Sequence, residues 1–437
     1  MGKLKVLELF GGIGACSKAL ERLGIDYEIA DYVEIDKYAV KSFNAIHNTN
    51  FEPQDITQWD KDIEVDLVMH GSPCQDFSLA GLQAGGDEGS GTRSSLMYET
   101  IRIVKKLKPK YVVWENVKNL LSKKHRHNFD AYLEIMESLG YKNYYQVLNA
   151  KDYGIPQNRE RVFTISIRKD IQISDEIKPS VRKNFEREKE EISKTNKEIY
   201  QCECESGWQD NKVGIKVSPT IRANNNNTFV LEDNIDFKFP PKQELKLKLK
   251  DMLEDEVDEK YYLSDDKIDK ISHWKGFQKP FEKVQGKNSV VPTLTARGAG
   301  EEHNGMITFS DNLEDTTNLQ EQCLNIKNAT KKGYQEAFEG DSVNLVYPDS
   351  ETRRGRVGKQ VSQTLQCNDS MGVVNNDLRI RKLTPLETWR LMGFDDEDFE
   401  KASRVNSNSQ LYKQAGNSIV VNVLIAIFNE LLKKEGE

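Results

Sequence analysis

Three short segments place a thiol, a carboxyl group and two guanidinium groups close to the ends of strand-like runs. GSPCQDFS carries Cys74 directly after a proline, WENV carries Glu115, and QNRERVF carries Arg159 and Arg161. A thiol acts as a nucleophile only as its thiolate, which needs positive or polar neighbours. Alternate residues of a strand share a face, so we expect both arginines on one side. An ion pair of Glu115 with an arginine would also fit this pattern, but it would not explain Cys74.

A glycine turn near the N-terminus predicts a site for an adenosine-containing cofactor. In LELFGGIGACS, Gly11, Gly12 and Gly14 would let a ligand approach the backbone at the start of a helix, although a serine stands in place of the third glycine of the usual fingerprint. Glu34, roughly 20 residues after the turn, is placed to bind ribose hydroxyls. Asp55 follows a third strand-like region, where it could reach the adenine. The pattern leaves open a dinucleotide or S-adenosylmethionine.

The elements that would position these groups alternate between strand and helix patterns up to about residue 170. Helical periodicity begins after Gly14, Lys37, Ser94 and Asn128. This alternation predicts an α/β fold with a Rossmann-like, doubly wound and mostly parallel sheet, covered on both faces. Ligands of such sheets bind at the carboxyl ends of the strands, where Cys74 would lie. The expected strands are residues 5–10, 27–35, 66–72, 111–117, 144–150 and 161–168.

The chain changes character after about residue 170. Residues 178–198 are charged and poor in apolar side chains, which predicts a solvated helix or a linker. Three similar octets, VSPTIRAN, VVPTLTAR and VSQTLQCN, follow at irregular intervals and suggest a recurring strand-turn unit in a second, smaller β-rich domain. Asn417 and Ser418 precede a final apolar helix and are expected to cap it. The predicted division is 1–178, 179–378 and 379–437.

The motifs together resemble the cytosine-5 DNA methyltransferases. LFGGIG, GSPCQ, ENV, QNRER, RKLTPLETWRLMGF and GNSIVVNV occur in the order of that family, and the likeness covers about residues 4–170 and 379–434. The resemblance implies the S-adenosylmethionine-dependent methyltransferase fold, with a target-recognition domain between QNRER and the closing motifs. The last helix would then return to the catalytic domain.

The resemblance also implies a mechanism. Carbon 5 of cytosine is a poor nucleophile, so Cys74 would add to carbon 6, Glu115 would protonate ring nitrogen 3 and Arg161 would bind the base carbonyl. The base must leave the helix stack to react, and residues 79–95 would be the loop that closes over it. The implied catalytic residues are Cys74, Glu115, Arg161, Arg159, Asn116, Gln75 and Pro73. Those implied for the cofactor are Phe10, Gly11, Gly12, Gly14, Glu34, Ile35, Asp55, Ile56, Ser72, Asn417 and Ser418.

Double-stranded DNA is the expected partner. In TRRGRVGK, glycines would let Arg353, Arg354 and Arg356 approach DNA, although a solvated loop would look the same. Recognition regions of this family often carry a Thr-Leu pair, as at Thr364 here, and Ser78 is a further expected DNA contact. The net charge of −8 argues weakly against a nucleic-acid partner, but binding depends on local basic patches rather than on the total.

Composition indicates a soluble, cytoplasmic protein. The six cysteines show neither a disulfide framework nor metal-ligand spacing, so we expect no metal. Glu8 interrupts the N-terminal apolar run, which argues against a secretory signal, and no stretch is apolar enough to be expected to cross a membrane. The chain is expected to act as a monomer. The sequence does not show whether a cognate restriction endonuclease exists; one would be linked to it functionally but not physically.

Three other functions compete with this hypothesis. A transfer-RNA methyltransferase shares the scaffold but lacks a large recognition domain, whereas this chain carries about 200 polar residues there. A catalytically silent DNA-binding subunit would not need Cys74, Glu115 and Arg161. A dehydrogenase would need a His or Tyr that handles hydride, which the motifs do not supply.

Overall fold

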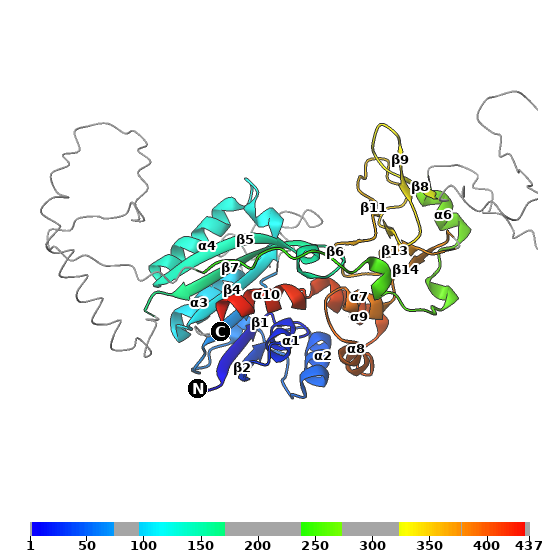
Figure 1. Ribbon diagram of the computed structural model, residues 1–437. Helices are drawn as coiled ribbons and strands as arrows, with labels where there is room; N and C mark the ends of the chain where they lie inside the picture. Colours follow the sequence, from blue (N-terminus) through cyan, green and yellow to red (C-terminus); the bar gives the residue numbers. More distant parts are fainter. Residues whose placement is uncertain (1, 74–95, 171–236, 273–322, 377, 433–437) are drawn as a thin grey trace, which may run out of the picture.

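The computed structural model describes residues 2–73, 96–170, 237–272, 323–376 and 378–432 (Figure 1). Cys74, Gln75, Ser78 and the expected closing loop 79–95 lie outside the described residues. So do the charged segment 178–198 and the first two octets.

A six-stranded mixed sheet forms the larger part of the molecule. Its strand order is β2-β1-β3-β4-β7-β5, and β7 runs antiparallel to both of its neighbours while the β2-β1-β3-β4 part is parallel. The six strands predicted from the sequence, and the mostly parallel sheet, are thereby confirmed. The strands are β1 (Leu4–Leu9), β2 (Tyr27–Val33), β3 (Leu67–His70), β4 (Tyr111–Val117), β5 (Tyr141–Asn149) and β7 (Glu160–Arg168).

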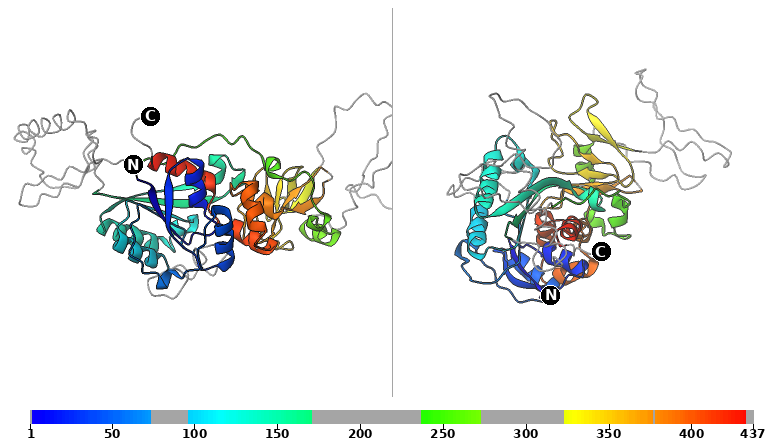
Figure 2. Two further views of the ribbon diagram at one scale, coloured as in Figure 1. Left: turned by 90° about the horizontal axis from the view of Figure 1, so that it is seen from below. Right: turned by 60° about the vertical axis from the view of Figure 1, so that its left-hand side comes forward.

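Helices cover both faces of this sheet, as the doubly wound pattern predicts (Figure 2). Helices α1 (Ala15–Arg22) and α10 (Val421–Leu431) pack against each other and share one apolar cluster with β1. Helices α3 (Met97–Leu107) and α4 (Arg126–Ser138) pack on the opposite face in a second cluster. Helix α2 (Lys37–His47) follows β2. Asp36 caps its N-terminus, because the Asp36 carboxylate accepts a hydrogen bond from the amide of Tyr38.

The C-terminal segment differs from the predicted capped helix. Asn417 is the last residue of α9, Ser418 is its C-cap, and α10 begins after Val420 without a side-chain cap, so the cap prediction was wrong. The stretch Asn408–Leu431 has the length and composition of a membrane span, which the sequence analysis did not expect, but 72% of its apolar window is buried inside the protein. The segment comprises α7 (Pro385–Arg390), α8 (Asp396–Ser403), α9 (Asn408–Asn417) and α10.

A smaller β-rich part stands beside the sheet (Figure 1). It holds a four-stranded antiparallel sheet in the order β11-β10-β13-β14 and a β8–β9 hairpin. Strand β12 pairs with β6, which precedes β7 of the six-stranded sheet. Its elements are α6 (Asp265–Ile271), β8 (Leu324–Lys327), β9 (Tyr334–Ala337), β10 (Ser342–Asn344), β11 (Val357–Gly358), β12 (Ser362–Gln363), β13 (Met371–Val374) and β14 (Ile380–Lys382), with β6 at Gln157–Asn158. Short 3-10 turns are η1 (Ile56–Gln58), η3 (Lys118–Leu121), η4 (Ala150–Tyr153), η5 (Leu249–Met252) and η6 (Glu259–Tyr261).

A buried ion pair joins this smaller part to α7 and gives a prediction about stability. Arg381 makes two hydrogen bonds of 2.8 and 2.7 Å to Glu387, whose side chain is 0% exposed. Replacing Arg381 with alanine would leave a buried carboxylate without its cation, so we expect a loss of about 3–5 kcal/mol in the free energy of unfolding. Arg379→Ala removes an exposed pair with Glu259 and is expected to cost less than about 1 kcal/mol. Urea unfolding followed by circular dichroism compares the two variants, and equal losses would contradict the prediction.

Candidate active site

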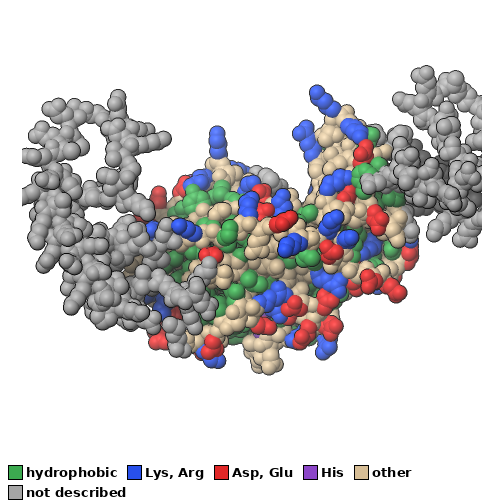
Figure 3. Space-filling view, in the orientation of Figure 1, with side chains coloured by type: hydrophobic (Ala, Val, Ile, Leu, Met, Phe, Trp, Pro, Cys, Tyr) green, Lys and Arg blue, Asp and Glu red, His purple; other side chains and the backbone are tan. Residues whose placement is uncertain are grey.

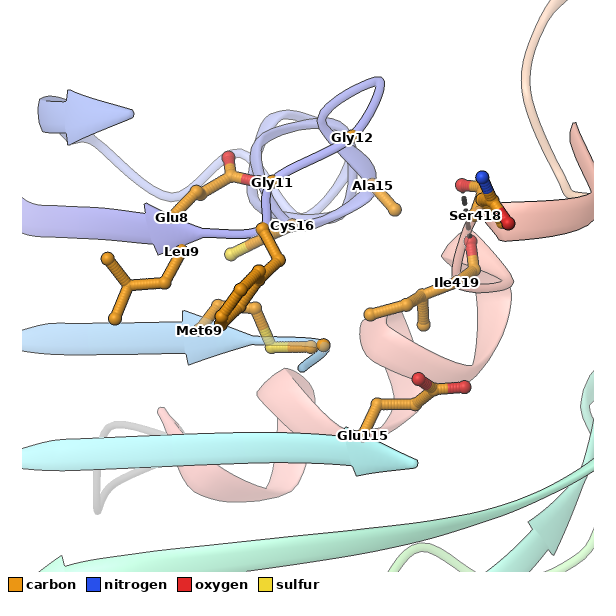
Figure 4. A pocket seen from close by; sticks show the side chains of 13 residues that line it. Glu8, Leu9, Gly11, Gly12, Ala15, Cys16, Met69, Glu115, Ser418 and Ile419 are labelled. Carbon is orange, nitrogen blue, oxygen red and sulfur yellow. Dashed lines mark hydrogen bonds between the residues drawn. The ribbon is translucent and has the colours of Figure 1, made fainter. Parts of the chain in front are cut away.

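A pocket opens at the carboxyl ends of β1, β3 and β4, where the fold predicts a ligand site (Figure 4). The glycine turn and the start of α1 form one wall, the junction of α9 and α10 forms another, and Glu115 extends into it from β4. Its lining residues are Glu8, Leu9, Phe10, Gly11, Gly12, Ala15, Cys16, Met69, Gly71, Glu115, Asn417, Ser418 and Ile419. The structure therefore brings the predicted cofactor turn and the predicted acid together.

Glu115 and Arg161 form an ion pair at this site. Nε of Arg161 lies 2.9 Å from Oε1 of Glu115, and both side chains are mostly buried. The antiparallel register, which pairs Val117 with Arg161, brings the start of β7 to the end of β4. Oε1 of Glu115 receives no well-directed hydrogen bond, so the contact is chiefly electrostatic. A carboxyl and a guanidinium held in this way could face a polar heterocycle from two sides.

Arg159 is fixed by the backbone of the C-terminal segment. It lies just before β7 begins, is 4% exposed, and donates to the carbonyl oxygens of Gly416 at 3.0 Å and Ser418 at 2.7 Å. A weaker contact of 3.4 Å reaches the carbonyl of Leu365. Unlike Arg161, it therefore supports the wall of the pocket that Asn417 and Ser418 form.

The residues around the end of β3 are held by β4. Gly71 lines the pocket, whereas the hydroxyl of Ser72 accepts a hydrogen bond from the indole of Trp114. Asn116 directs its side-chain amide toward the same serine. Pro73 is half-buried and is the last described residue before Cys74. The hydroxyl of Ser72, predicted to contact a cofactor, is thus held by the neighbouring strand.

The glycine turn is shaped by two backbone positions. Gly12 has φ of +56° and a Cβ there would meet open space, so a ligand can approach its Cα, although its N–H and carbonyl are bonded to Glu34 and to the hydroxyl of Tyr32. Gly14, with φ of +82°, is needed for packing, because a Cβ there would lie 2.2 Å from the ring of His47. Glu34 accepts hydrogen bonds from the amides of Gly12 at 3.1 Å and Asp36 at 2.9 Å, and burial raises its pKa. Its carboxylate therefore holds the turn.

The other predicted cofactor contacts differ in their exposure. Ile35 follows Glu34 and is 68% exposed, which is unusual for a large apolar side chain. Asp55 precedes the third strand of the chain rather than following it, and its carboxylate caps η1 through the amide of Thr57 at 2.9 Å. The side chain of Ile56 is buried in the core, so only its backbone is available to a ligand.

Glu8 is a lining residue to which the sequence analysis gave no role. Its carboxylate is 2% exposed and accepts hydrogen bonds from the amide, at 3.1 Å, and the hydroxyl of Ser17. Burial raises the pKa of Glu8 to about 7. The signal was present in the sequence, because an acid inside the apolar run LELF needs a reason to be there.

The raised pKa of Glu8 predicts how stability changes with pH. An acid whose pKa is higher in the folded protein contributes stability that is present below its ordinary value of 4.5 and is lost as the pH rises to about 7. Glu8→Gln cannot ionise, so we expect it to lose less stability over that interval than wild type, by on the order of 3 kcal/mol. Urea midpoints at several pH values test this. Glu28→Gln, at an exposed carboxyl of β2, should retain the wild-type slope.

Arg356 corrects the predicted DNA-binding run. Its side chain is 0% exposed, and its guanidinium donates to the carbonyls of Val346 at 3.2 Å and Tyr347 at 2.6 Å, with longer contacts to Asn344 and Ser350. The loop before it folds back so that these carbonyls converge on one cation. Arg356 therefore holds the loop together and is not available to DNA.

The other predicted DNA contacts remain at the surface or near a hollow. Arg354 is exposed and Arg353 is half-buried, with its guanidinium 3.1 Å from the side chain of Asn344. The hydroxyl of Thr364 donates to the carbonyl of Asn158 at 2.8 Å, which ties the smaller part to β6. Between β6 and β11 lies a hollow, and Figure 3 shows Lys and Arg side chains on both parts of the molecule around it. It is lined by Lys151, Asn158, Asn344, Gly355, Val357, Gly358, Lys359, Val361, Gln363, Thr364 and Gln366.

Two solved structures share the fold. The chain superposes on a mutant of DNMT2 from Spodoptera frugiperda with a TM-score of 0.52, 17% identity and coverage of 99% of this chain and 100% of that one. The methyltransferase EhMeth of Entamoeba histolytica gives a TM-score of 0.52, 15% identity and coverage of 99% and 100%. These likenesses confirm the methyltransferase fold.

Sequence comparison is more specific. The chain is 33% identical to the orphan methyltransferase M.SPRI of Bacillus phage SPR, over 99% of this chain and 98% of that protein. It is 30% identical to the type II methyltransferase M2.ScrFI of Lactococcus lactis subsp. cremoris, over 99% and 100%. The family model for C-5 cytosine-specific DNA methylases matches residues 4–433, which confirms the resemblance seen in the motifs. This chain therefore belongs to the C-5 cytosine-specific DNA methylase family.

Proposed function

We propose that the protein transfers a methyl group from S-adenosylmethionine to carbon 5 of a cytosine flipped out of duplex DNA, with Cys74 as the nucleophile. The observation that carries the proposal is one pocket that contains the glycine turn on one side and Glu115, paired with Arg161, on the other. A methyl donor and a base held there would face each other.

The residues of the pocket fit an adenosine cofactor. The Cα of Gly12 faces open space, and Glu34 is fixed beside it with lone pairs left for ribose hydroxyls. Exposed Ile35 offers an apolar surface to the adenine ring, and Asp55 and the backbone of Ile56 could bind its edge. Phe10, Asn417 and Ser418 would hold the remainder. The sulfonium supplies the methyl group, so the protein has to bind, orient and exclude water.

The chain's own groups account for the activation of cytosine. Attack of the Cys74 thiolate on carbon 6 moves electron density to carbon 5 and toward ring nitrogen 3. Glu115 would give a proton to nitrogen 3 as that charge develops, and Arg161 would donate hydrogen bonds to the base carbonyl. After methylation, water would take the carbon 5 proton, the electrons of that bond would re-form the double bond between carbons 5 and 6, and Cys74 would leave as its thiolate while nitrogen 3 returns its proton to Glu115. Stacked bases hide these carbons, so the base must be flipped.

DNA would lie along the hollow between β6 and β11. Lys151 and Lys359 line the hollow, and Arg353 lies beside it, 3.1 Å from the side chain of Asn344. The side chains of Gln363 and Gln366 could read base edges. We further propose that residues 1–178 and 379–437 form the catalytic unit and 179–378 the recognition unit. One copy of the chain would suffice for the reaction, because all proposed reacting groups belong to one chain. We place this monomer in the cytoplasm. A partner endonuclease, if the organism has one, would act on the same DNA sequence without binding this chain.

The substrate class can be tested with tritiated S-adenosylmethionine. The full chain is incubated with duplex DNA or with transfer RNA, and the DNA is then sequenced after bisulfite treatment. We expect tritium in DNA only, at cytosines within a defined sequence. Label in RNA alone would favour the transfer-RNA alternative, and label in neither would refute methyl transfer.

A further inference from the structure

A tight turn with two adjacent lysines follows β4, the strand that ends at the candidate active site. The amide of His125 donates to the carbonyl oxygen of Ser122 at 3.0 Å, which closes the turn. Lys123 and Lys124 lie at its tip, and both side chains are exposed. We call residues 122–125 the lysine turn.

Buried residues and side-chain contacts on either side fix the lysine turn. Leu120, in the 3-10 turn η3 just before it, and His125, its last residue, are both buried. Arg126 begins α4 and donates to the carboxylate of Asp130 at 2.7 Å and to the hydroxyl of Tyr145 on β5 at 3.2 Å. The backbone of the turn is therefore held from both ends, while its two lysines remain accessible to a partner.

The lysine turn belongs to the edge of the sheet that carries the candidate active site. Lys118, the first residue of η3, forms an ion pair of 2.9 Å with Glu160 at the start of β7. Arg161, which pairs with Glu115, is the next residue of β7. Asn158, two residues before Glu160, lines the hollow between β6 and β11. The segment that leads into the lysine turn is thus in contact with the strand that joins the active-site ion pair to the hollow.

The charge of this segment is opposite to that of the whole chain. Residues 118–127, KNLLSKKHRH, contain four Lys or Arg residues and no acid, whereas the chain carries a net charge of −8. Lys118 and Arg126 form ion pairs within the protein, and the two charges at the tip, on Lys123 and Lys124, are exposed. A local basic patch on an acidic protein attracts anions. Duplex DNA, with one negative charge for about every 1.7 Å of its helix axis, is the polyanion that the proposed reaction brings to this edge.

We propose that the lysine turn binds phosphates of the DNA duplex beside the flipped cytosine. This inference rests on the proposed function and goes beyond it, because it names a DNA contact on the catalytic part in addition to the hollow. Ammonium groups contact phosphate without reading sequence, so the turn would hold the strand while other residues read the bases. A strand held next to the target would be kept from sliding when the base leaves the stack.

The test measures how tightly the full chain binds duplex DNA at several salt concentrations. Lys123→Gln combined with Lys124→Gln removes two exposed charges and no buried contact. At about 0.1 M salt we expect this double variant to bind about tenfold more weakly, by the same factor on the target sequence and on an unrelated duplex of equal length. The slope of log affinity against log salt should fall by about 1.8 in magnitude. Lys123→Arg with Lys124→Arg should restore both quantities, because the charges return.

Lys105 and Lys106 provide the matched control. They are also adjacent and exposed, but they lie in the last turn of α3, which precedes the amino end of β4. Replacing both with glutamine changes the net charge by the same amount. This control should keep the DNA affinity within about twofold and the wild-type salt slope, because binding depends on the local patch rather than on the total charge.

The outcomes separate this inference from the proposed function. A lysine-turn variant with the wild-type salt slope, or a control variant that loses as much affinity, would overturn the phosphate contact. If the turn contributes to binding of transfer RNA but not of duplex DNA, the partner is misassigned. If the wild-type chain binds DNA through the turn but transfers no methyl group, the proposed function fails while the phosphate contact stands.

Discussion

Replacing Cys74 with alanine is expected to abolish methyl transfer to DNA and to leave S-adenosylmethionine binding in place. Without the thiolate nothing adds to carbon 6, so carbon 5 stays too poor in electrons to accept the methyl group. The loss should be a factor on the order of 10⁴ or more, as for other enzymes that lose their nucleophile. The proposed cofactor contacts, from Phe10 to Ser418, belong to other segments. Tritium transfer and calorimetric titration with the cofactor measure the two effects separately.

Cys16 provides the control for this prediction because it lines the same pocket. It is 1% exposed at the start of α1, and burial raises the pKa of its thiol well above the ordinary value. It should therefore remain a thiol and take no part in attack. Cys16→Ala is expected to retain most of the transfer activity. DNA labelling by Cys74→Ala, or a trapped adduct that maps to Cys16, would show that the nucleophile is misassigned.

The sequence placed Glu115 and Arg161 in one site because both lie close to strand ends. Glu115 lies near the end of an apolar strand and Arg161 near the start of another, and the two ends meet at one edge because β7 runs antiparallel beside β4. Only the antiparallel direction of β7 brings its start to the carboxyl end of β4, and the pattern did not show that direction; a parallel β7 would have placed Arg161 at the opposite edge. Period-two alternation and the spacing of glycines are local properties, and local properties are what a sequence displays.

The predictions from the sequence failed for side chains and backbone groups whose contacts come from distant segments of the chain. Arg356 looks like its neighbours in the run TRRGRVGK, and only the convergence of four carbonyls from an earlier loop turns it inward. Ser418 looks like a helix N-cap, but its carbonyl is held by Arg159, which lies 259 positions earlier in the chain. The hydrogen bond from Trp114 to Ser72 likewise joins two residues that are 42 positions apart in the chain. No single segment contains the information for such contacts.

Replacing Glu115 with glutamine is the second change expected to have a large effect. Glutamine keeps the shape of the side chain and can donate a hydrogen bond, but it cannot transfer a proton to ring nitrogen 3. We expect methyl transfer to fall by about 10²–10⁴-fold, the usual contribution of a general acid, and adduct formation to slow by a similar factor. The affinity for S-adenosylmethionine should stay close to that of the wild type, because Glu115 and Gly12 lie on opposite sides of the pocket.

Glu160→Gln controls for the loss of a carboxylate near Arg161. Glu160 opens β7 but pairs with Lys118 at the surface, where its side chain is 45% exposed. Its replacement is expected to leave the rate within about twofold, since exposed ion pairs contribute little. Arg161→Met and Glu115→Gln should be less than additive when combined, because the two groups lie 2.9 Å apart and would act on one base. Full additivity, or a Glu115→Gln enzyme that keeps more than about a tenth of the wild-type rate, would mean that nitrogen 3 receives its proton from another group.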